Sequence, residues 1–358
     1  MSNCPKFAVL FVISGAAWCA HWNPRQAADY LDAREKAWAA WPVAKAAGGT
    51  CVSCHTQLTY ALARPTLRKL LGETGPTPYE TAVLAGVTER TDGNAHMFGA
   101  ARFTKEPLAS QAEGVQSVLA ALLLARSDTS SQMSPTTAHA FDRMWAAQLR
   151  SGAAKGSWAW FDLNDDPYET QPSAYYGATL AALAAGAAPA SYREKPEVQA
   201  HLDDLTAYLR NSQNGQPLHN RLMLLWVSAA LPAVWPAASC APIVKEVLGQ
   251  QQPDGGWTMD SLGPWKDHPD AAISSGSTNY ATAVVALALE QSGMRPSAPP
   301  LAKALRWLRH HQASAGYWEA ISMNKHYDAG SMQDLFMRDA ATAFASMALA
   351  EADLRSRD

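Results

Sequence analysis

The sequence has few charged residues for its length. Only 17% of the 358 residues are charged, the formal net charge is -3, and no long basic run occurs. A nucleic-acid surface needs clustered Lys and Arg, so this class of function is excluded. Since 48% of the residues are hydrophobic, the chain can bury a large core, and a disordered protein is excluded as well.

Cysteines are also scarce, and only two of them form a C-x-x-C pair. Cys51 and Cys54 make that pair, and the other cysteines are Cys4, Cys19 and Cys240. No second C-x-x-C follows, so a zinc site built from two such pairs is excluded. The pair must therefore serve another purpose.

The N-terminal stretch has the features of an export signal. Residues 1–20 contain Lys6, an apolar run at 7–17, and small residues at 15–17 before a cleavage point. The run is too short to span a membrane comfortably, so we expect no membrane span after the signal is removed. The sequence thus predicts a periplasmic protein without Cys4 and Cys19, in an oxidising compartment.

The clearest motif is the C-x-x-C-H element from Cys51 to His55. Two thiols at this spacing can each bond a vinyl group of one haem, and the adjacent histidine can then bind the iron. We therefore expect one covalent c-type haem per chain, with His55 as the proximal ligand. The alternative is a Cys51–Cys54 disulfide without haem.

Strand signals are almost absent, and alanine- and leucine-rich segments with helical periodicity follow one another along the chain. Pro65 predicts a kink or break in the helix after the motif. The sequence therefore predicts an all-α fold. The expected helices in the second part of the chain cover residues 112–125, 138–149, 175–185, 198–209, 221–230, 242–248, 278–289, 301–310 and 339–351.

Several of these helices end in a similar way. Gln251 to Trp257 and Gln312 to Trp318 share the pattern Q-x-x-x-G-x-W. Gln148 to Gly152 with Trp158, and Gln213 to Gly215, are degenerate relatives. We expect the glutamine to bond free carbonyls at its own helix end, the glycine to form a left-handed cap, and the tryptophan to cover the turn. Successive copies lie roughly 40 to 65 residues apart, and this spacing is typical of repeated helix pairs.

On these residues the chain resembles the squalene-hopene cyclase and terpenoid cyclase superfamily. With the Cys51–Gln57 segment it looks like exported, haem-motif-bearing proteins described as squalene-cyclase-like. The resemblance covers roughly residues 36–352 and implies an α/α toroid. It implies two arrangements for residues 21–127: a separate cytochrome c-like domain, or the first helices of the toroid. Residues 128–358 would form toroid repeats.

The chemistry of the cyclases does not carry over. Squalene-hopene-type cyclases protonate an alkene with the central acid of a D-x-D-D motif. The nearest string here runs from Asp162 to Asp165, with Asn164 where the proton donor should be. An amide cannot supply that proton, so cyclase activity is excluded and we expect this string to be a solvated loop. Cys240 also lacks the partners of a prenyltransferase zinc site.

The second axial ligand of a haem would decide its function. Candidates are His96 or Met97, and, after the last repeat tryptophan, Met323 or His326 in a polar cluster with Lys325. Among the carboxylates, Glu169 lies between aromatic residues. It is a candidate acid with a raised pKa, or else a helix-start carboxylate that faces water.

The sequence therefore predicts an exported haem protein on a toroid, acting in electron transfer or in oxidation of an apolar or aromatic small molecule in the toroid cavity. Its partner would be that molecule or a redox protein. One alternative is a non-redox toroid enzyme or binding protein for an isoprenoid or glycan. Another is a structural toroid without catalysis.

Overall fold

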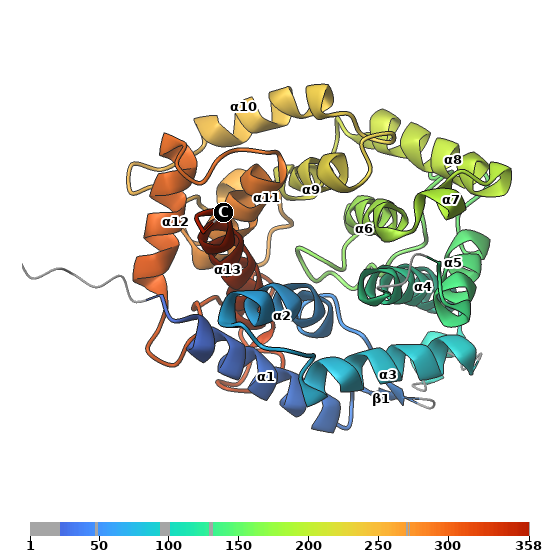
Figure 1. The fold of residues 1–358 in the computed structure, drawn as a ribbon, viewed down its shortest axis with the longest axis horizontal. Helices are drawn as coiled ribbons and strands as arrows, with labels where there is room; N and C mark the ends of the chain where they lie inside the picture. Colours follow the sequence, from blue (N-terminus) through green and yellow to red (C-terminus); the bar gives the residue numbers. More distant parts are fainter. Residues whose placement is uncertain are drawn as a thin grey trace, which may run out of the picture.

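The computed structural model describes residues 22–46, 49–93, 101–128, 132–269, 271 and 273–357. The expected export segment lies outside these residues. Most described residues belong to helices that form two concentric rings, seen end-on in Figure 1. The inner ring contains α2 (Gln57–Leu71), α4 (Leu108–Ser127), α6 (Ser173–Ala187), α9 (Leu218–Ala230), α11 (Asn279–Gln291) and α13 (Phe336–Arg355). The outer ring contains α1 (Pro24–Ala40), α3 (Pro78–Asp92), α5 (Pro135–Ala146), α8 (Pro196–Ser212), α10 (Ala241–Gly249) and α12 (Pro299–His311).

Outer and inner helices alternate along the chain, which is the α/α toroid that the resemblance implies. Each expected helix of the second part overlaps one of these helices. The inner ring closes where α13 packs against α2, so the last inner helix contacts the first. The helices on both sides of the Cys51–His55 segment are therefore part of the ring. Two minor elements are helix α7 (Ala190–Arg193) and the antiparallel strands β1 (Lys45–Ala46) and β2 (Gly49–Thr50).

Apolar patterning separates the two rings. The inner helices α4, α6 and α11 are buried along almost their whole length, because each contacts two inner neighbours and an outer helix. Helix α4 is long and apolar enough to cross a membrane, but 72% of its most apolar window is buried inside the ring. The outer helix α8 buries only one face, formed by Val198, Leu202, Leu205 and Leu209.

Every outer helix has a proline in its first two positions: Pro24, Pro78, Pro135, Pro196, Pro242 and Pro299. Proline suits this place because the first helical N–H groups have no intrahelical partner and the ring fixes φ near its helical value. Proline inside a helix is less favourable, yet Pro65 does not end α2, which continues to Leu71. Of the kink or break expected there, a break is wrong, because the buried Leu67 and Leu70 hold the second half of α2 in the core.

The repeat turns have one shared structure. Their tryptophans are fully buried, and each indole Nε1 donates to a carbonyl near the end of the preceding outer helix. These bonds join Trp158 to Met144 (2.6 Å), Trp257 to Val247 (2.7 Å) and Trp318 to Leu308 (2.8 Å). The repeat glycines have positive φ angles, as expected of left-handed turns: 94° at Gly156, 99° at Gly255 and 91° at Gly316. Gly152 also has a positive φ, 75°, but Gln148 bonds the carbonyl of Gly156, so Gly156 takes the place of the repeat glycine in the first turn.

The glutamines act differently from the prediction. Each Nε2 donates to the glycine carbonyl of its own turn and to a carbonyl of the next outer helix or its N-cap. The second partners are His201 for Gln148 (3.0 Å), Pro300 for Gln251 (2.9 Å) and Asn23 for Gln312 (3.1 Å). The prediction that the glutamine caps its own helix was wrong, because the tryptophan indole already bonds a carbonyl in the last turn of that helix. The glutamine instead links neighbouring outer helices.

The last of these links closes the outer ring. Gln312 Oε1 also accepts a 2.6 Å hydrogen bond from the backbone N–H of Asn23, the N-cap of α1. Gly316 lies so close to α1 that a Cβ there would stand 2.2 Å from the carbonyl oxygen of Gln26. The last repeat turn thus contacts the start of α1 through the side chain of Gln312 and the backbone at Gly316.

Candidate functional site

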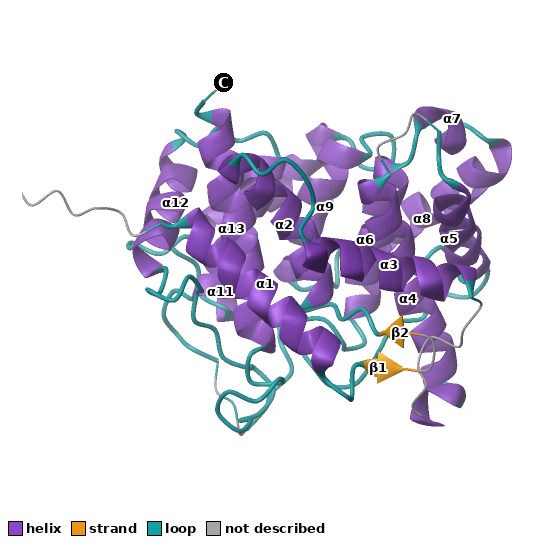
Figure 2. Cartoon of the chain, turned by 60° about the horizontal axis from the view of Figure 1, so that its bottom comes forward, coloured by secondary structure: helices purple, strands orange, loops and turns teal. Residues whose placement is uncertain are grey.

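The inner helices all begin at one end of the toroid, so the loops that enter them gather there. In Figure 2 this is the lower end, where the longest loops and the β1–β2 pair lie. A cavity of about 540 Å³ opens among these loops, and we call it the motif cavity. It receives His55 from the loop before α2, Glu169 from the loop before α6, and Lys325 from the loop before α13.

The C-x-x-C-H segment is held rigidly against the ring. The backbone N–H of Cys51 donates to Ala44 O at 2.8 Å, and the indole of Trp38 donates to Cys51 O at 2.9 Å. The Ser53 hydroxyl accepts from the N–H groups of Thr56 and Gln57, both at 3.1 Å. Ser53 thereby satisfies donors at the start of α2 that have no intrahelical partner.

Both thiols of the motif line the cavity as free cysteines. Cys54 is 1% exposed, and burial raises the pKa of its thiol well above the usual range. Burial likewise raises the pKa of Cys51 to about 12, although the charge of Arg90 acts in the opposite direction. A reactive dithiol has a lowered pKa, so these buried thiols do not suit that role. No group of three or more metal-ligating side chains occurs among the described residues.

His55 is buried, and its ring stacks on Phe336 with ring centroids 3.6 Å apart. Burial, and next the charge of Arg34, lower the pKa of His55 to about 3, so the imidazole is neutral. Its Nδ1 lies 3.2 Å from the Thr56 hydroxyl, whose single proton is donated to Asp339 at 2.9 Å. The Thr56 oxygen must therefore accept from Nδ1–H, which leaves the lone pair on Nε2 for a ligand.

Asp339 anchors this arrangement from the first turn of α13. It is 1% exposed, and Arg34 of α1 binds it through two bonds, Nε–Oδ1 at 2.7 Å and Nη2–Oδ2 at 3.0 Å. Tyr30 donates a further bond at 2.9 Å. A buried ion pair contributes little to stability on balance, but this one fixes the direction of the Thr56 hydroxyl and hence the orientation of His55.

The lining of the motif cavity comprises an apolar set of side chains, which we call its apolar wall, and a polar set, its polar wall. Trp38, Trp41, Phe103, Phe161 and Phe336 are the aromatic members of the apolar wall. At the rim, Val43 is 68% exposed and Leu163 is 39% exposed. Large apolar side chains that remain in water indicate a surface that a ligand or a partner covers.

The polar wall is crosslinked by Asn324. Its side chain accepts from Asp166 N at 2.9 Å, donates to Asp166 O at 2.9 Å and also bonds Asp165. Burial, and next the charge of Asp166, raise the pKa of Asp165 to about 6. His268 Nε2 lies 3.5 Å from Asp166 Oδ2. The string from Asp162 to Asp165 is a loop, as expected: Asp162, Leu163 and Asn164 are exposed to solvent, and Asp165 is partly covered where it bonds Asn324.

The structure distributes the predicted site residues unevenly. Cys51, Cys54, His55 and Glu169 line the motif cavity, and Glu169 stands in the loop before α6 instead of at a helix start. Met323 is buried in the wall of a second cavity, and His326 is exposed; neither lines the motif cavity. His96 and Met97 lie outside the described residues.

Several residues of the site escaped prediction. Thr56 follows the motif directly and Asp339 resembles an ordinary helix entry, yet the two meet across the ring closure. Arg34 gave a weak signal, since a lone arginine on an apolar helix face often has a buried partner. His268 gave none, because it lies in a loop whose place against Asp166 depends on the whole fold.

Comparison with known proteins supports the fold. No protein-family model matches the chain, and no curated protein matches its sequence. Among solved structures, the chain is similar to a variant unsaturated glucuronyl hydrolase, named together with the oligosaccharide dGlcA-Glc-Rha-Glc. The TM-score is 0.51 with 15% sequence identity, over 89% of this chain and 95% of that chain.

At this level of identity the likeness shows the fold alone. The predicted fold class is confirmed: the chain is an all-α toroid.

Proposed function

We propose that this chain is an exported c-type haem protein, with the haem bonded to Cys51 and Cys54 and its iron bound by His55, and that it acts in redox chemistry. The observation that carries the proposal is that both thiols and His55 line one cavity. A c-type haem requires two thiols and one imidazole that are accessible from the same space.

The other residues of the motif cavity fit such a group. Its volume of about 540 Å³ lies within the usual range of small-molecule and cofactor sites. The aromatic wall suits a flat apolar ring system, and the exposed Lys325 at the polar side can pair with carboxylates of the cofactor. Asp165 and Glu169 lie on the same side, so the carboxylates of the cofactor would be protonated or well hydrated near them.

Haem supplies a one-electron couple whose potential is set by its axial ligands and their hydrogen bonds. The chain's own residues would prepare its surroundings. Thr56 and Asp339 fix His55 with Nε2 free, and Phe336 holds the ring face. The exposed rim residues Val43 and Leu163 would contact a redox partner protein or the cofactor edge.

The test is a pyridine haemochrome spectrum of the full chain, produced in a periplasm equipped for haem attachment. We expect about one haem per chain in the wild type and none in Cys51→Ala/Cys54→Ala. A circular dichroism spectrum of the double variant controls for folding. Absence of haem from folded wild-type protein would overturn the proposal.

A second candidate function has support from the fold and from the carboxylates. The similar structure is that of a hydrolase named with an oligosaccharide, and Asp165, with its raised pKa, stands near Asp166 and Glu169. A carboxylic acid with a pKa near 6 suits general acid catalysis on a glycan. In that case a chain without haem would cleave an unsaturated glucuronyl oligosaccharide, and Asp165→Asn would abolish the cleavage.

A further inference from the structure

A second cavity lies at the same end of the toroid, between the first turns of α11 and α13. Its volume is about 300 Å³, and its lining includes Met259, Tyr280, Trp307, Met323 and Met337. Well-packed interiors leave few voids of this size, and methionines adapt to the shape of what they contact. A space of this size at the site end of the toroid is large enough for a small organic molecule.

The lining carries little charge. Glu319 lines it, but its carboxylate accepts from Arg338 at 2.6 Å, and no Lys or Arg is found among the described lining residues. Asn279 donates through Nδ2 to Glu319 O at 2.8 Å, whereas its Oδ1 is buried and has no hydrogen-bond partner in the described part of the chain. The cavity thus offers apolar contacts, the imidazole of His311 and several hydroxyls, and its described lining has no Lys or Arg for an anionic ligand.

The mouth of the second cavity is apolar as well. Ile321 lines it and is 63% exposed. Within the described residues, large hydrophobic side chains are exposed at Val43, Leu163 and Ile321, and each of these lines the motif cavity or the second cavity. The large hydrophobic side chains that are exposed in the described part of the chain therefore lie beside these two spaces, where a ligand could cover them.

We propose that the second cavity binds a neutral, largely apolar small molecule that carries a hydroxyl or N–H group. The apolar body contacts the methionines, Tyr280 and Trp307. The donor group bonds one of the hydroxyl oxygens that line the cavity, those of Ser274, Ser277, Thr278 and Ser322.

The second cavity and His55 both border one small pocket. Phe336 stacks on His55, and the next residue, Met337, lines the second cavity. A small pocket between the two spaces is lined by His55, Tyr168 and Met337, and the Tyr168 hydroxyl lies 2.5 Å from that of Tyr280. If the proposed haem function holds, the bound molecule would be a substrate. The proposal that the cavity binds it does not depend on haem.

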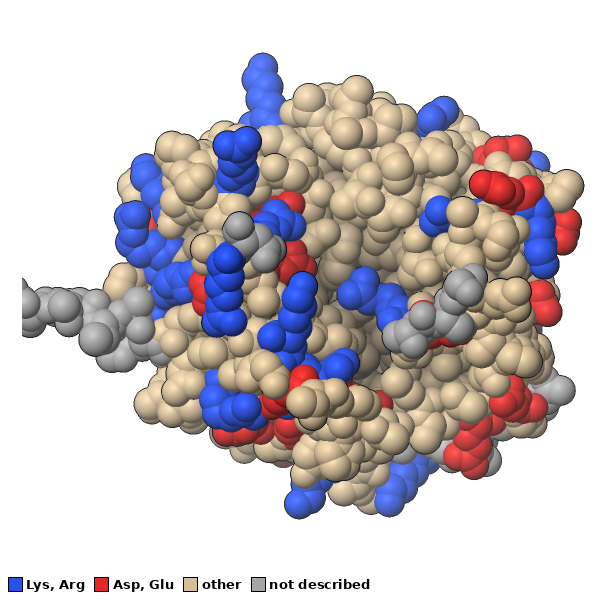
Figure 3. Space-filling model, viewed as in Figure 1, with Lys and Arg blue, Asp and Glu red and all other residues tan. Residues whose placement is uncertain are grey.

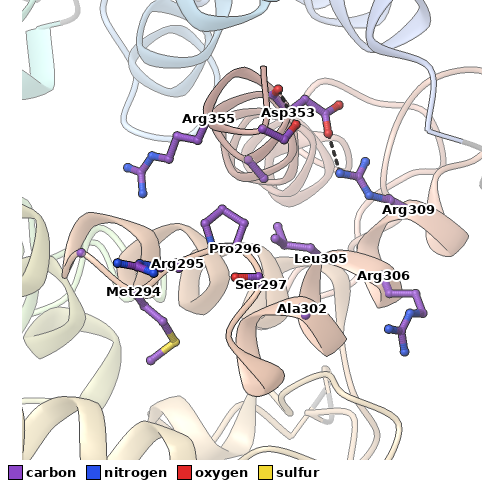
Figure 4. Close-up of a pocket in the computed structure, with 13 residues that line it drawn as sticks. Met294, Arg295, Pro296, Ser297, Ala302, Leu305, Arg306, Arg309, Asp353 and Arg355 are labelled. Carbon is purple, nitrogen blue, oxygen red and sulfur yellow. Dashed lines mark hydrogen bonds and ion pairs between the residues drawn. The ribbon is translucent and has the colours of Figure 1, made fainter. Parts of the chain in front are cut away.

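The opposite end of the toroid offers a contrasting groove that serves as a control. That face is hollowed near its centre in Figure 3, with Lys and Arg side chains around the hollow. A groove of about 660 Å³ there has Arg295, Arg306, Arg309 and Arg355 around Pro296, Leu305 and Ala302 (Figure 4). A neutral apolar molecule has no reason to prefer this groove.

The experiment is calorimetric titration of the full haem-bearing chain with 1-naphthol and with anionic 1-naphthoate. We expect 1-naphthol to bind at least about tenfold more tightly than 1-naphthoate. Ala320→Trp, which fills the second cavity, should weaken 1-naphthol binding at least about tenfold. The matched control Ala302→Trp, in the arginine-lined groove, should leave the affinity unchanged.

The inference is overturned if wild-type protein does not bind 1-naphthol, if 1-naphthoate binds equally well, or if Ala302→Trp weakens binding as much as Ala320→Trp. Should Ala320→Trp fail to fold, Ile321→Asp alters an exposed side chain at the mouth; an unchanged affinity there also overturns the inference. A chain without haem that binds 1-naphthol refutes only the proposed function. A haem-bearing chain that does not bind it refutes only this inference.

Discussion

The hydroxyl of Thr56 donates a 2.9 Å hydrogen bond to the carboxylate of Asp339, which lies 283 residues further along the chain. The bond joins the N-cap of α2 to the first turn of α13, where the inner ring closes. The same hydroxyl oxygen lies 3.2 Å from Nδ1 of His55. This contact therefore couples the closure of the inner ring to the orientation of the candidate haem ligand.

Replacing Thr56 tests that contact. Thr56→Val keeps the side-chain shape but removes the oxygen that accepts from His55, so the imidazole becomes a weaker electron donor. If the chain carries haem, we expect a midpoint potential more positive by on the order of 60 mV, which is a tenfold effect for one electron. Redox titration measures it. Thr56→Ser should stay near the wild type, and equal potentials in all three proteins would contradict this role.

The outer-ring closure depends on Gln312. Gln312→Leu leaves the carbonyls of Asn23 and Gly316, and the N–H of Asn23, without their amide partner. We expect a loss of about 1–3 kcal/mol in the free energy of unfolding, measured by urea titration. Gln250→Leu changes an exposed glutamine near another repeat turn and should stay within about 0.5 kcal/mol of the wild type. Similar losses in both variants would argue against a special role for the closure.

The close approach of Gly316 to α1 gives a second prediction about closure of the outer ring. An alanine there must adopt a φ of 91° and place its Cβ 2.2 Å from Gln26 O, so α1 has to move. Gly330 also has a positive φ, 74°, but a Cβ there meets nothing within 4 Å. Gly330→Ala should therefore cost about 1 kcal/mol from backbone strain alone, and Gly316→Ala clearly more. Equal losses of unfolding free energy in the two variants would show that α1 can move away from Gly316 at no cost.

Glu290 in α11 predicts a pH dependence of stability. It is 1% exposed, and its carboxylate oxygens have no hydrogen-bond partner among the described residues. Burial, and next the charge of Glu351, raise the pKa of Glu290 to about 9, while Arg355 and Arg309 act in the opposite direction. The folded chain therefore keeps a proton that the unfolded chain releases near pH 4.5, and stability falls as pH rises from there towards 9.

Glu290→Gln removes this titration. We expect a flatter dependence of the unfolding free energy on pH, and a gain on the order of 2 kcal/mol at pH 8. Urea titrations at several pH values measure both. Glu194→Gln replaces an exposed carboxylate and should keep the wild-type slope. If the slope is the same in Glu290→Gln, the buried carboxyl is not protonated in the folded chain.

Local sequence signals predicted much of the fold. The spacing of glutamine, glycine and tryptophan fixes the repeat turns, because a buried indole and a left-handed glycine both require their place in one short segment. The motif itself placed Cys51, Cys54 and His55 at one site. The role of the glutamine was misjudged because its second partner lies on the next outer helix, about 50 residues away for Gln251.

The rest of the site could not be read from neighbouring residues. Asp339 meets Arg34, and Asp166 faces His268, only after the ring has closed. Asp165 lies in a loop, as expected, but its contact with Asn324, 159 residues further along the chain, could not be predicted. Its raised pKa arises from burial by distant loops, which no local pattern encodes.

Intact-mass spectrometry of the chain from a haem-attaching periplasm tests the central claim most directly. We expect the mass of the exported chain plus one haem, with peptide mapping that places both thioether bonds on Cys51 and Cys54. A chain without haem that is two hydrogens lighter than its reduced sequence would carry a Cys51–Cys54 disulfide. That result would contradict the haem proposal and turn attention to Asp165 and its neighbouring carboxylates.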